Sequence, residues 1–283
     1  MVTRRFHRTW IAAALSCVIL VGMSGYGEAS IAKVSTHRGA AAALPLVHSG
    51  YLTVGSDTTY PPMESKDPST LKFVGADVDL ANALAKAMKL KGAIIVTNTF
   101  DTLINVMLSR HKFDIIMSSM NDRPDRRKLG VNFIDYMRAS EAIMVKKSSM
   151  IHANGYAGVC GHSVSVELGT TEADGLTAAN KQCKNRITIK TFATDTEAYT
   201  AFASGHSDAY TSDYPVVANY VKLHQSQYRE AGAPFGATEN YGIAVPKKST
   251  ALFRALTAAY HQLRSNGQYR QILRRWGLQG AAI

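Results

Sequence analysis

The feature of this sequence that most restricts its fold is an alternation of strand-like and helix-like segments, which occurs twice. Apolar runs of β type are followed by stretches with apolar residues at helical spacing. In the first half, strands are predicted at 52–55, 93–96 and 113–117, and helices at 77–88 and 103–108. Strands that alternate with helices in this way form a mostly parallel sheet, so this half predicts one α/β unit.

The same order of segments returns in the second half. The predicted elements are strands at 164–166, 187–192, 209–210 and 241–245, and helices at 171–181, 197–203 and 252–276, the last with a break at Asn266-Gly267. A chain of 283 residues with 46% apolar residues can form two cores. The segment with Pro61, Pro62 and Pro68 is predicted to be a loop.

The first 29 residues have the layout of a secretory signal peptide. Three arginines among the first eight residues precede an apolar stretch over 10–23, and Gly27-Glu28-Ala29 offers a small-x-small cleavage site. A membrane anchor is the alternative, but spanning a bilayer needs about 20 apolar residues. We therefore expect cleavage after Ala29, an N-terminal extension over 30–49, and a mature protein in the periplasm.

The positive charge of the chain does not indicate a nucleic-acid-binding protein. With 32 Lys and Arg against 21 Asp and Glu, the net charge is +11. The basic residues are nevertheless scattered, and the nearest approach to a cluster, 123–128, is interrupted by an acid. No nucleic-acid recognition motif accompanies the charge, so no nucleic-acid partner is predicted.

The cysteines predict one disulfide. Removal of 1–29 takes away Cys17 and leaves Cys160 and Cys183. An even pair in an exported protein favours a bridge, with two free thiols as the alternative. The bridge would close a loop of about two dozen residues, which is worth about 3 kcal/mol in the chain-entropy model.

Polar loops follow the predicted strands, and these loops are where function is expected. Ligands of open α/β sheets bind beyond the carboxyl ends of the strands. The loops in question are 57–60, 118–121 and 169–171, together with Asp213, and Arg126 lies just beyond the second loop. No Ser-His-Asp, metal-binding or phosphate-binding pattern is present in the sequence, so no metal and no cofactor are predicted.

Segments across residues 50–278 resemble, in order, the polar amino-acid family of periplasmic solute-binding proteins. The segments are 54–62, 74–81, 113–116, 132–136, 168–171, 205–209, 241–245 and 266–277. The resemblance implies a protein that captures an amino acid outside the inner membrane and delivers it to the permease of an ABC importer. It implies a binding protein rather than an enzyme, and we expect it to act as a monomer.

The resemblance also implies a fold. Members of the family have the type II periplasmic-binding-protein fold, with two α/β lobes that close on the ligand like a hinge. Each lobe is a mostly parallel sheet flanked by helices, and two crossover strands join the lobes. Lobe 1 is predicted to contain 50–138 and 239–283, and lobe 2 is predicted to contain 139–238.

The charged α-groups of an amino acid need matching partners. Arg126 stands at the family's arginine position and can give a carboxylate a planar, bidentate donor. Asp213 stands where the family places the partner of the α-ammonium group. Further donors for the carboxylate are predicted at the loop and helix-start residues Ser118, Ser119, Asn121, Thr170 and Thr171. From the residues alone, Arg126 could instead be solvated. The two threonines could be helix caps, a role that is compatible with ligand binding.

The side chain of the ligand is predicted to meet aromatic and acidic residues. Tyr60 and Phe100 occupy the family's two aromatic positions, although Phe100 could be a core residue. Asp57 and Asp77 match positions at the distal end of the ligand, and Glu167 stands where glutamine binders tend to carry lysine. Three acids favour a basic ligand such as lysine, arginine, ornithine or histidine. A neutral polar ligand stays open, because Asp77 is common in the family and Glu167 could face water.

Two other functional classes are compatible with the pattern. Periplasmic cyclohexadienyl or prephenate dehydratases resemble these binders and carry a glutamate where Glu172 stands, so Glu172 could be a general acid. Asp213 favours the binding protein, because a substrate without an amine has no use for an ammonium partner. A receptor sensor domain is the third class, and it would need a transmembrane or kinase segment.

Overall fold

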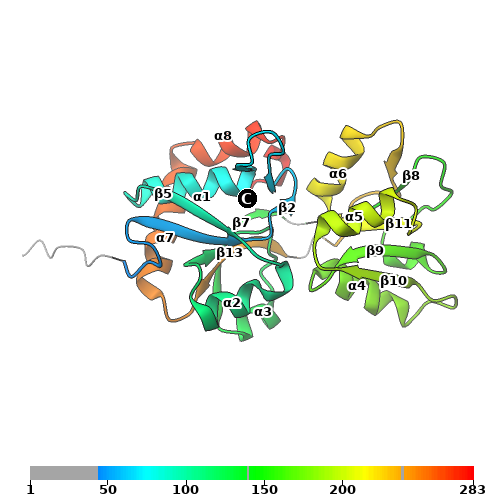
Figure 1. The fold of residues 1–283 in the computed structure, drawn as a ribbon, viewed down its shortest axis with the longest axis horizontal. Coiled ribbons are helices and arrows are strands. Elements are labelled where there is room, and N and C mark those ends of the chain that lie inside the picture. The colour runs from blue at the N-terminus through cyan, green and yellow to red at the C-terminus, as the bar shows by residue number, and fades with distance from the viewer. Residues whose placement is uncertain (1–43, 139, 237–238) are drawn as a thin grey trace, which may run out of the picture. The chain divides into compact units, whose positions relative to one another are not determined.

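The computed structural model describes residues 44–138, 140–236 and 239–283. The predicted signal peptide over 1–29 and most of the predicted extension lie outside these ranges. Within them the chain forms two five-stranded sheets and one small three-stranded sheet (Figure 1). No helix in the described ranges is both long and apolar enough to cross a membrane.

The first large sheet has the strand order β5-β1-β6-β13-β7. Its strands are β1 (Tyr51–Ser56), β5 (Gly92–Thr97), β6 (Ile115–Ile116), β7 (Val131–Arg138) and β13 (Asn240–Pro246). β1 pairs in parallel with β5 and β6, whereas β13 runs antiparallel to both of its neighbours. The helices around this sheet are α1 (Ala76–Ala87), α2 (Leu103–Arg110), α3 (Pro124–Lys128), α7 (Thr250–Ser265) and α8 (Gln268–Arg275). Figure 1 shows α1 and α2 on opposite faces of it.

The second large sheet repeats this plan with the order β10-β9-β11-β8-β12. Its strands are β8 (Glu141–Lys146), β9 (Ser163–Glu167), β10 (Thr188–Phe192), β11 (Ala209–Asp213) and β12 (Tyr228–Glu230). β8 runs antiparallel to β11 and β12, and the other strands run in one direction. Its helices are α4 (Thr171–Asn180) on one face and α5 (Asp195–Ala203) and α6 (Tyr214–Leu223) on the other.

The predicted α/β fold class, with mostly parallel sheets flanked by helices, is confirmed. The chain passes between the two sheets twice, from β7 to β8 and from β12 to β13. Residues 139 and 237–238, inside the predicted crossovers, lie outside the described ranges. The exact lobe boundaries at 138 and 239 stay a prediction.

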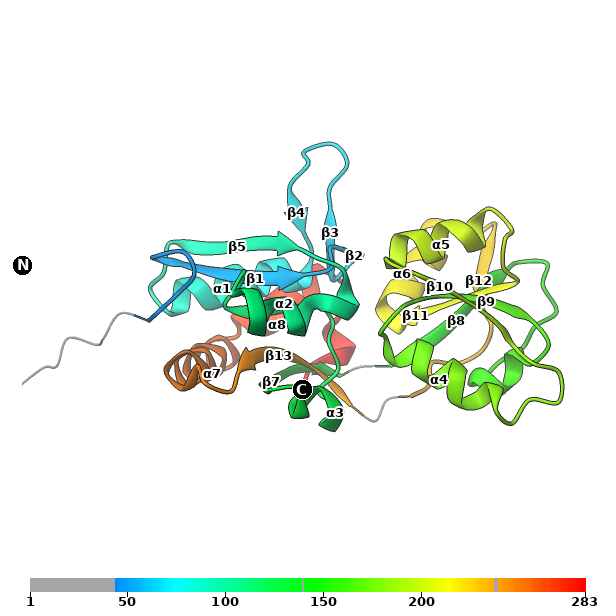
Figure 2. The same ribbon diagram turned by 60° about the horizontal axis from the view of Figure 1, so that its bottom comes forward.

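The prediction of a plain loop around Pro61, Pro62 and Pro68 is wrong. This segment contains the small antiparallel sheet of β2 (Thr59–Tyr60), β3 (Glu64–Lys66) and β4 (Phe73–Val74), and Figure 2 shows β3 and β4 as a hairpin. The hairpin depends on Gly75, whose φ is +137°, because a Cβ there would lie 2.1 Å from the carbonyl oxygen of Met63. The proline pattern contained no sign of this close approach.

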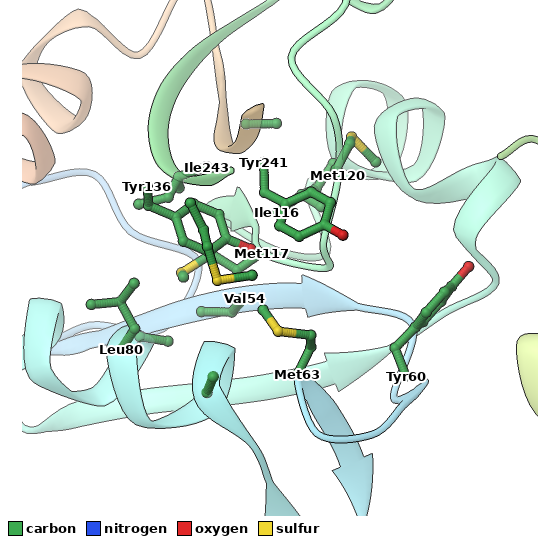
Figure 3. Close-up of a cluster of buried hydrophobic side chains, with 14 of the residues drawn as sticks. Val54, Tyr60, Met63, Leu80, Ile116, Met117, Met120, Tyr136, Tyr241 and Ile243 are labelled. Atoms are coloured by element: carbon green, nitrogen blue, oxygen red, sulfur yellow. The ribbon is translucent and has the colours of Figure 1, made fainter. Parts of the chain in front are cut away.

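The core of the first sheet is built from large side chains of both chain segments that form it. Figure 3 shows Tyr136 and Tyr241, from β7 and β13, facing Val54 of β1, with Met117 between them and Met63 beside Val54. All five side chains are buried. Because β13 comes from the end of the chain, this core fixes the C-terminal part of the chain to the sheet that the first half begins.

The predicted disulfide between Cys160 and Cys183 is present. Cys160 follows a short 3₁₀ turn, Tyr156–Val159, and Cys183 follows the end of α4. The Cα atoms are 5.5 Å apart and 23 positions apart in sequence. The bridge therefore fixes the end of α4 to the segment that leads into β9.

We expect replacement of both Cys160 and Cys183 by serine to lower the free energy of unfolding by about 3 kcal/mol, because the unfolded chain regains the entropy of the closed loop. Urea denaturation of the oxidised protein and of the double variant measures the difference. Wild-type protein treated with a reductant is the control and should match the variant. Equal denaturation midpoints for all three samples would contradict this role.

Candidate functional site

The predicted functional loops come together in the structure. The loops after β1 and β6 are joined by a hydrogen bond from the backbone N–H of Asp57 to Oγ of Ser118, at 2.9 Å. The loop after β1 meets the end of β9, because the hydroxyl of Tyr60 donates to Glu167. Of the twelve predicted ligand-binding residues, Thr171 is half-buried and the others are buried, namely Asp57, Tyr60, Asp77, Phe100, Ser118, Ser119, Asn121, Arg126, Glu167, Thr170 and Asp213.

Arg126 is a buried cation that is held by backbone carbonyl oxygens. Its side chain, in the last turn of α3, is 6% exposed. The guanidinium donates to the carbonyl oxygens of Asn121, at 3.1 Å, and Gly169, at 3.2 Å, and lies 5.1 Å from the ring centre of Phe100. Within the described ranges it forms no salt bridge. Burial lowers the pKa of Arg126, but a guanidinium stays charged, so the site can accept an anion.

Asp213 is a buried acid that forms no salt bridge within the described part of the chain. It ends β11 and is 5% exposed, and its Oδ1 has no hydrogen-bond partner in the described part of the chain. Burial, followed by the nearby charge of Glu172, raises the pKa of Asp213 well above its ordinary value. A positive group that reached Oδ1 would relieve both effects.

The serine and threonine loops are held mainly by protein contacts. Ser118 donates to Oε1 of Glu64 at 3.1 Å. Thr170 caps α4 by accepting a hydrogen bond from the backbone N–H of Ala173, so the cap interpretation is correct for this residue. Thr171 donates to the side-chain oxygen of Asn121 at 3.3 Å, which joins the loop after β6 to the start of α4.

Asp77 lies in a different group of acids from the one that was predicted. Its Oδ2 accepts hydrogen bonds from the backbone N–H of Ser119, at 3.2 Å, and from the hydroxyl of Tyr136, at 2.7 Å. Glu64, which the sequence interpretation missed, is fully buried beside it. Burial raises the pKa of Asp77 to about 6. Asp77 thus holds Ser119, whose φ is +47°, and its place at the distal end of the ligand stays a prediction.

Asp57 and Glu167 do lie together. The carboxylate of Asp57 accepts from the hydroxyl of Thr59, at 2.7 Å, and from the backbone N–H of Phe100, at 3.1 Å. Glu167 is 2% exposed and therefore does not face water, and its Oε1 has no partner in the described ranges. Burial, together with the charges of Asp57 and Asp195, raises the pKa of Glu167 to about 11.

Asp195 is a third acid of this group, and the sequence interpretation missed it. It is the first residue of α5, and its carboxylate accepts the hydroxyl of Tyr210 at 2.6 Å. Its backbone N–H donates to the hydroxyl of Thr59 at 3.3 Å, and that hydroxyl in turn contacts Asp57. Burial raises the pKa of Asp195 to about 7. The capping-box pattern of α5 predicts the start of a helix at this point, but it does not indicate a ligand site.

The two predicted aromatic residues are neighbours. The ring centres of Tyr60 and Phe100 are 6.1 Å apart and the planes meet at 54°. The rings therefore form an angled wall rather than two parallel faces. Phe100 also supports the guanidinium of Arg126 from its ring face, so it does more than fill the core.

The charges of the buried residues are strongly unequal. In the described ranges, Arg126 is the one buried base. Asp114, just before β6, is a buried acid that backbone N–H groups of Val47 and Thr53 hold. The other buried acids are Asp57, Glu64, Asp77, Glu167, Glu172, Asp195 and Asp213. No group of three or more His, Cys, Asp or Glu side chains among the described residues is arranged to hold a metal ion. An excess of buried carboxyl groups favours a ligand that brings positive charge.

Comparison with known proteins places these loops in a recognised context. The family model of bacterial extracellular solute-binding proteins, family 3, matches residues 52–279. The glutamine-binding protein GlnH of an ABC transporter of Bacillus subtilis is 31% identical over 214 residues, which is 75% of each chain. The arginine-binding protein ArgT of Corynebacterium glutamicum is 30% identical over 241 residues, 83% of this chain and 76% of that protein.

Solved structures agree with the sequence relatives. An ancestral arginine-binding protein bound to arginine has a TM-score of 0.74 and 31% identity, and the match covers 80% of this chain and 98% of that one. At this level of similarity the two chains share their fold.

We expect the free energy of unfolding of the empty protein to fall as the pH rises from about 4 to about 7. Asp77 and Asp195 have folded-state pKa values of about 6 and about 7, whereas aspartate titrates near pH 4 in an unfolded chain. Between these values the folded state binds more protons than the unfolded chain, so raising the pH favours unfolding. Urea denaturation of the empty protein at several pH values measures the slope.

Two variants separate the buried acids from the exposed ones. Asp195→Asn should make the slope shallower, because asparagine still accepts from Tyr210 and has no proton to lose. Asp67→Asn is the matched control, since Asp67 is exposed and hydrogen bonds from Ser69 and Thr70 lower its pKa to about 2. That control should leave the fall in place. A wild-type stability that rises steadily across this pH range would contradict the assignment.

Proposed function

Because this chain belongs to the bacterial extracellular solute-binding proteins of family 3, we propose that it binds a free amino acid and delivers it to the permease of an ABC transporter. The family match confirms the resemblance inferred from the loop segments. The relatives named above are binding proteins for glutamine or arginine. A dehydratase is less supported, because these relatives are named for binding and not for catalysis.

The observation that carries the proposal is a buried base and a buried acid, neither of which forms a salt bridge within the described ranges. Arg126 follows β6 of the first sheet and lacks a carboxylate partner in the described ranges. Asp213 ends β11 of the second sheet and keeps one oxygen without a partner. Every free α-amino acid carries a carboxylate and an ammonium group on the same carbon. Such a ligand satisfies both residues at once, and neither a simple anion nor a simple cation does.

The other predicted residues fit around this pair. We propose that Tyr60 and Phe100 contact the side chain of the ligand. Donors from the two polar loops would complete the carboxylate site, from the residues Ser118, Ser119, Asn121, Thr170 and Thr171. Several of these side chains already bind protein groups, so we expect rearrangement or backbone N–H groups to serve the ligand.

We further propose that the side chain of the ligand is cationic. Asp57, Glu167 and Asp195 are buried together, and Oε1 of Glu167 has no partner in the described ranges. Buried acids that face one another without a cation keep protons that they would lose in water. A lysine, arginine or ornithine side chain pairs with these acids, whereas the amide of glutamine leaves them without a counter-charge. Asp77 is not needed for this argument, and we propose that it acts by holding the loop at Ser119.

The proposal includes a cellular setting. The family acts outside the cytoplasm, and we propose that the signal-peptide pattern over 1–29 directs this protein to the periplasm. There it would act as a monomer whose two lobes, 50–138 with 239–283 and 139–238, close around the ligand at the two chain passages. The closed form would then be the one that the permease receives.

We expect Arg126→Ala to weaken amino-acid binding by roughly 2–5 kcal/mol, because the carboxylate of the ligand loses its buried counter-charge. Isothermal titration calorimetry with the best amino acid from a ligand screen measures the loss. Lys128→Ala is the matched control, because Lys128 is an exposed base at the end of the same helix. Equal affinity of Arg126→Ala and the wild type would remove Arg126 from the site.

We expect lysine or arginine to bind at least about a hundredfold more tightly than glutamine, a difference of roughly 2.7 kcal/mol. Asp57→Asn should reduce that preference without abolishing binding, since Arg126 and Asp213 still hold the α-groups. Competition titrations on the wild type, Asp57→Asn and the exposed control Asp67→Asn measure the preference. Glutamine that binds the wild type as tightly as lysine and arginine would refute the cationic side chain, but it would leave the amino-acid proposal intact.

A further inference from the structure

Glu172 is a buried acid that the proposed ligand contacts do not use. It is the second residue of α4 and is 3% exposed. Its Oε2 accepts a hydrogen bond from the hydroxyl of Thr171 at 3.1 Å, and its Oε1 has no partner in the described ranges. An acid in the first turn of a helix is stabilised by the helix dipole, but that role works at the surface and does not require burial.

Glu172 lies beside the loops of the proposed site, because the hydroxyl of Thr171 contacts both Asn121 and Glu172. After burial, the charge of Glu172 is the main cause that raises the pKa of Asp213, so the two acids are neighbours. Each acid keeps a buried oxygen without a partner in the described ranges, Oε1 of Glu172 and Oδ1 of Asp213. The charged and titratable groups around the two acids are Arg126, Glu141, Tyr156, Asp195 and Tyr241, with Glu64 and Tyr136 also near Asp213. The pair is thus two carboxyl groups beside one guanidinium.

We propose that Glu172 is a second carboxylate for the α-ammonium group of the ligand, which it and Asp213 hold together. The inference rests on the proposed function, since it assigns a further contact within the same site. An ammonium group has three N–H donors, and the two free oxygens of the pair supply two acceptors. Both oxygens are buried and lack a donor in the described ranges, so a donor that reaches them stabilises the complex.

Binding of the zwitterion changes the charge balance around the pair. In the empty site, burial raises the pKa of Glu172, and burial with the charge of Glu172 raises the pKa of Asp213. These acids therefore keep protons that they would lose in water. When the ligand binds, its carboxylate pairs with Arg126 and its ammonium group brings a positive charge to the two carboxyl groups. The ammonium group lowers their pKa values, and a bound proton leaves to solvent. Glu172 therefore couples amino-acid binding to the release of a proton.

The test is to count protons released on binding. Calorimetric titration of arginine and, separately, glutamine at pH 7 in buffers of different ionisation enthalpy gives the number of protons for each ligand. The proximal pair meets the α-ammonium group, so its release should occur with both ligands. We expect Glu172→Gln to lower the release by up to about one proton and to weaken arginine binding about tenfold or more. Glu172→Asp keeps the acid and should keep proton release, with weaker binding.

Asp174→Asn is the matched control, because Asp174 is an acid in the same first turn of α4 but is exposed. It should leave the proton count unchanged, and thermal melting shows which variants are folded. A folded Glu172→Gln that releases as many protons as the wild type overturns the inference, whether or not its affinity falls, because a purely structural role changes affinity alone. Wild-type protein that binds no amino acid overturns the proposed function and this inference with it.

Discussion

The buried guanidinium of Arg126 joins a loop of the first sheet to a loop of the second sheet through hydrogen bonds. It donates to one carbonyl from the loop after β6 and to another, that of Gly169, from the turn before α4. The second contact exists because Gly169 has no side chain, since its φ is +81° and a Cβ there would lie 2.8 Å from Cβ of Asp101. A backbone that comes this close to a neighbouring segment can present its carbonyl to the cation. The arginine is thereby held without a carboxylate and stays available for an anion.

Holding so many buried acids in place requires a rigid frame, because each one favours a looser and wetter arrangement. The frame is supplied by contacts that do not involve the proposed ligand-binding side chains. The tyrosine and methionine core of Figure 3 fixes β13 and β7 to β1, and the Cys160–Cys183 bridge fixes the end of α4 to the approach to β9. Glu167 ends β9, and Glu172 begins α4. The frame and the charged site are therefore built from the same elements.

Much of the fold was predictable, because the strand and helix patterns of this chain follow local rules that tertiary contacts reinforced. The assignment of Arg126 and Asp213 to the two α-groups of the ligand came only from the family resemblance and stays a prediction. Glu64 and Asp195 were missed for a physical reason, since each lies in a short polar segment whose burial depends on distant residues. Glu64 is buried because Gly75 allows the hairpin to fold back, and Asp195 is buried against Tyr210 and Thr59. The hydrogen bonds of Asp77 to Ser119 and Tyr136 were not predictable from the sequence, because those partners come from distant segments of the chain.

In the proposed site, the two groups of acids bind different parts of the ligand. The stability of the empty protein and its affinity for the ligand therefore change differently with pH. In the site that we propose, Glu172 and Asp213 hold the α-ammonium group, whereas Asp57, Glu167 and Asp195 hold the side chain of the ligand. In the empty protein, acids of both groups keep protons above the pH at which an unfolded chain loses them. A ligand with two positive groups displaces protons from both sets, and a ligand with only the α-ammonium group displaces them from one. Because binding that releases protons strengthens as the pH rises, a cationic amino acid gains more affinity than glutamine does over the same pH range in which the empty protein becomes less stable. In the proposed site, the buried acids that lower the stability of the empty protein therefore also make it selective for a cationic amino acid.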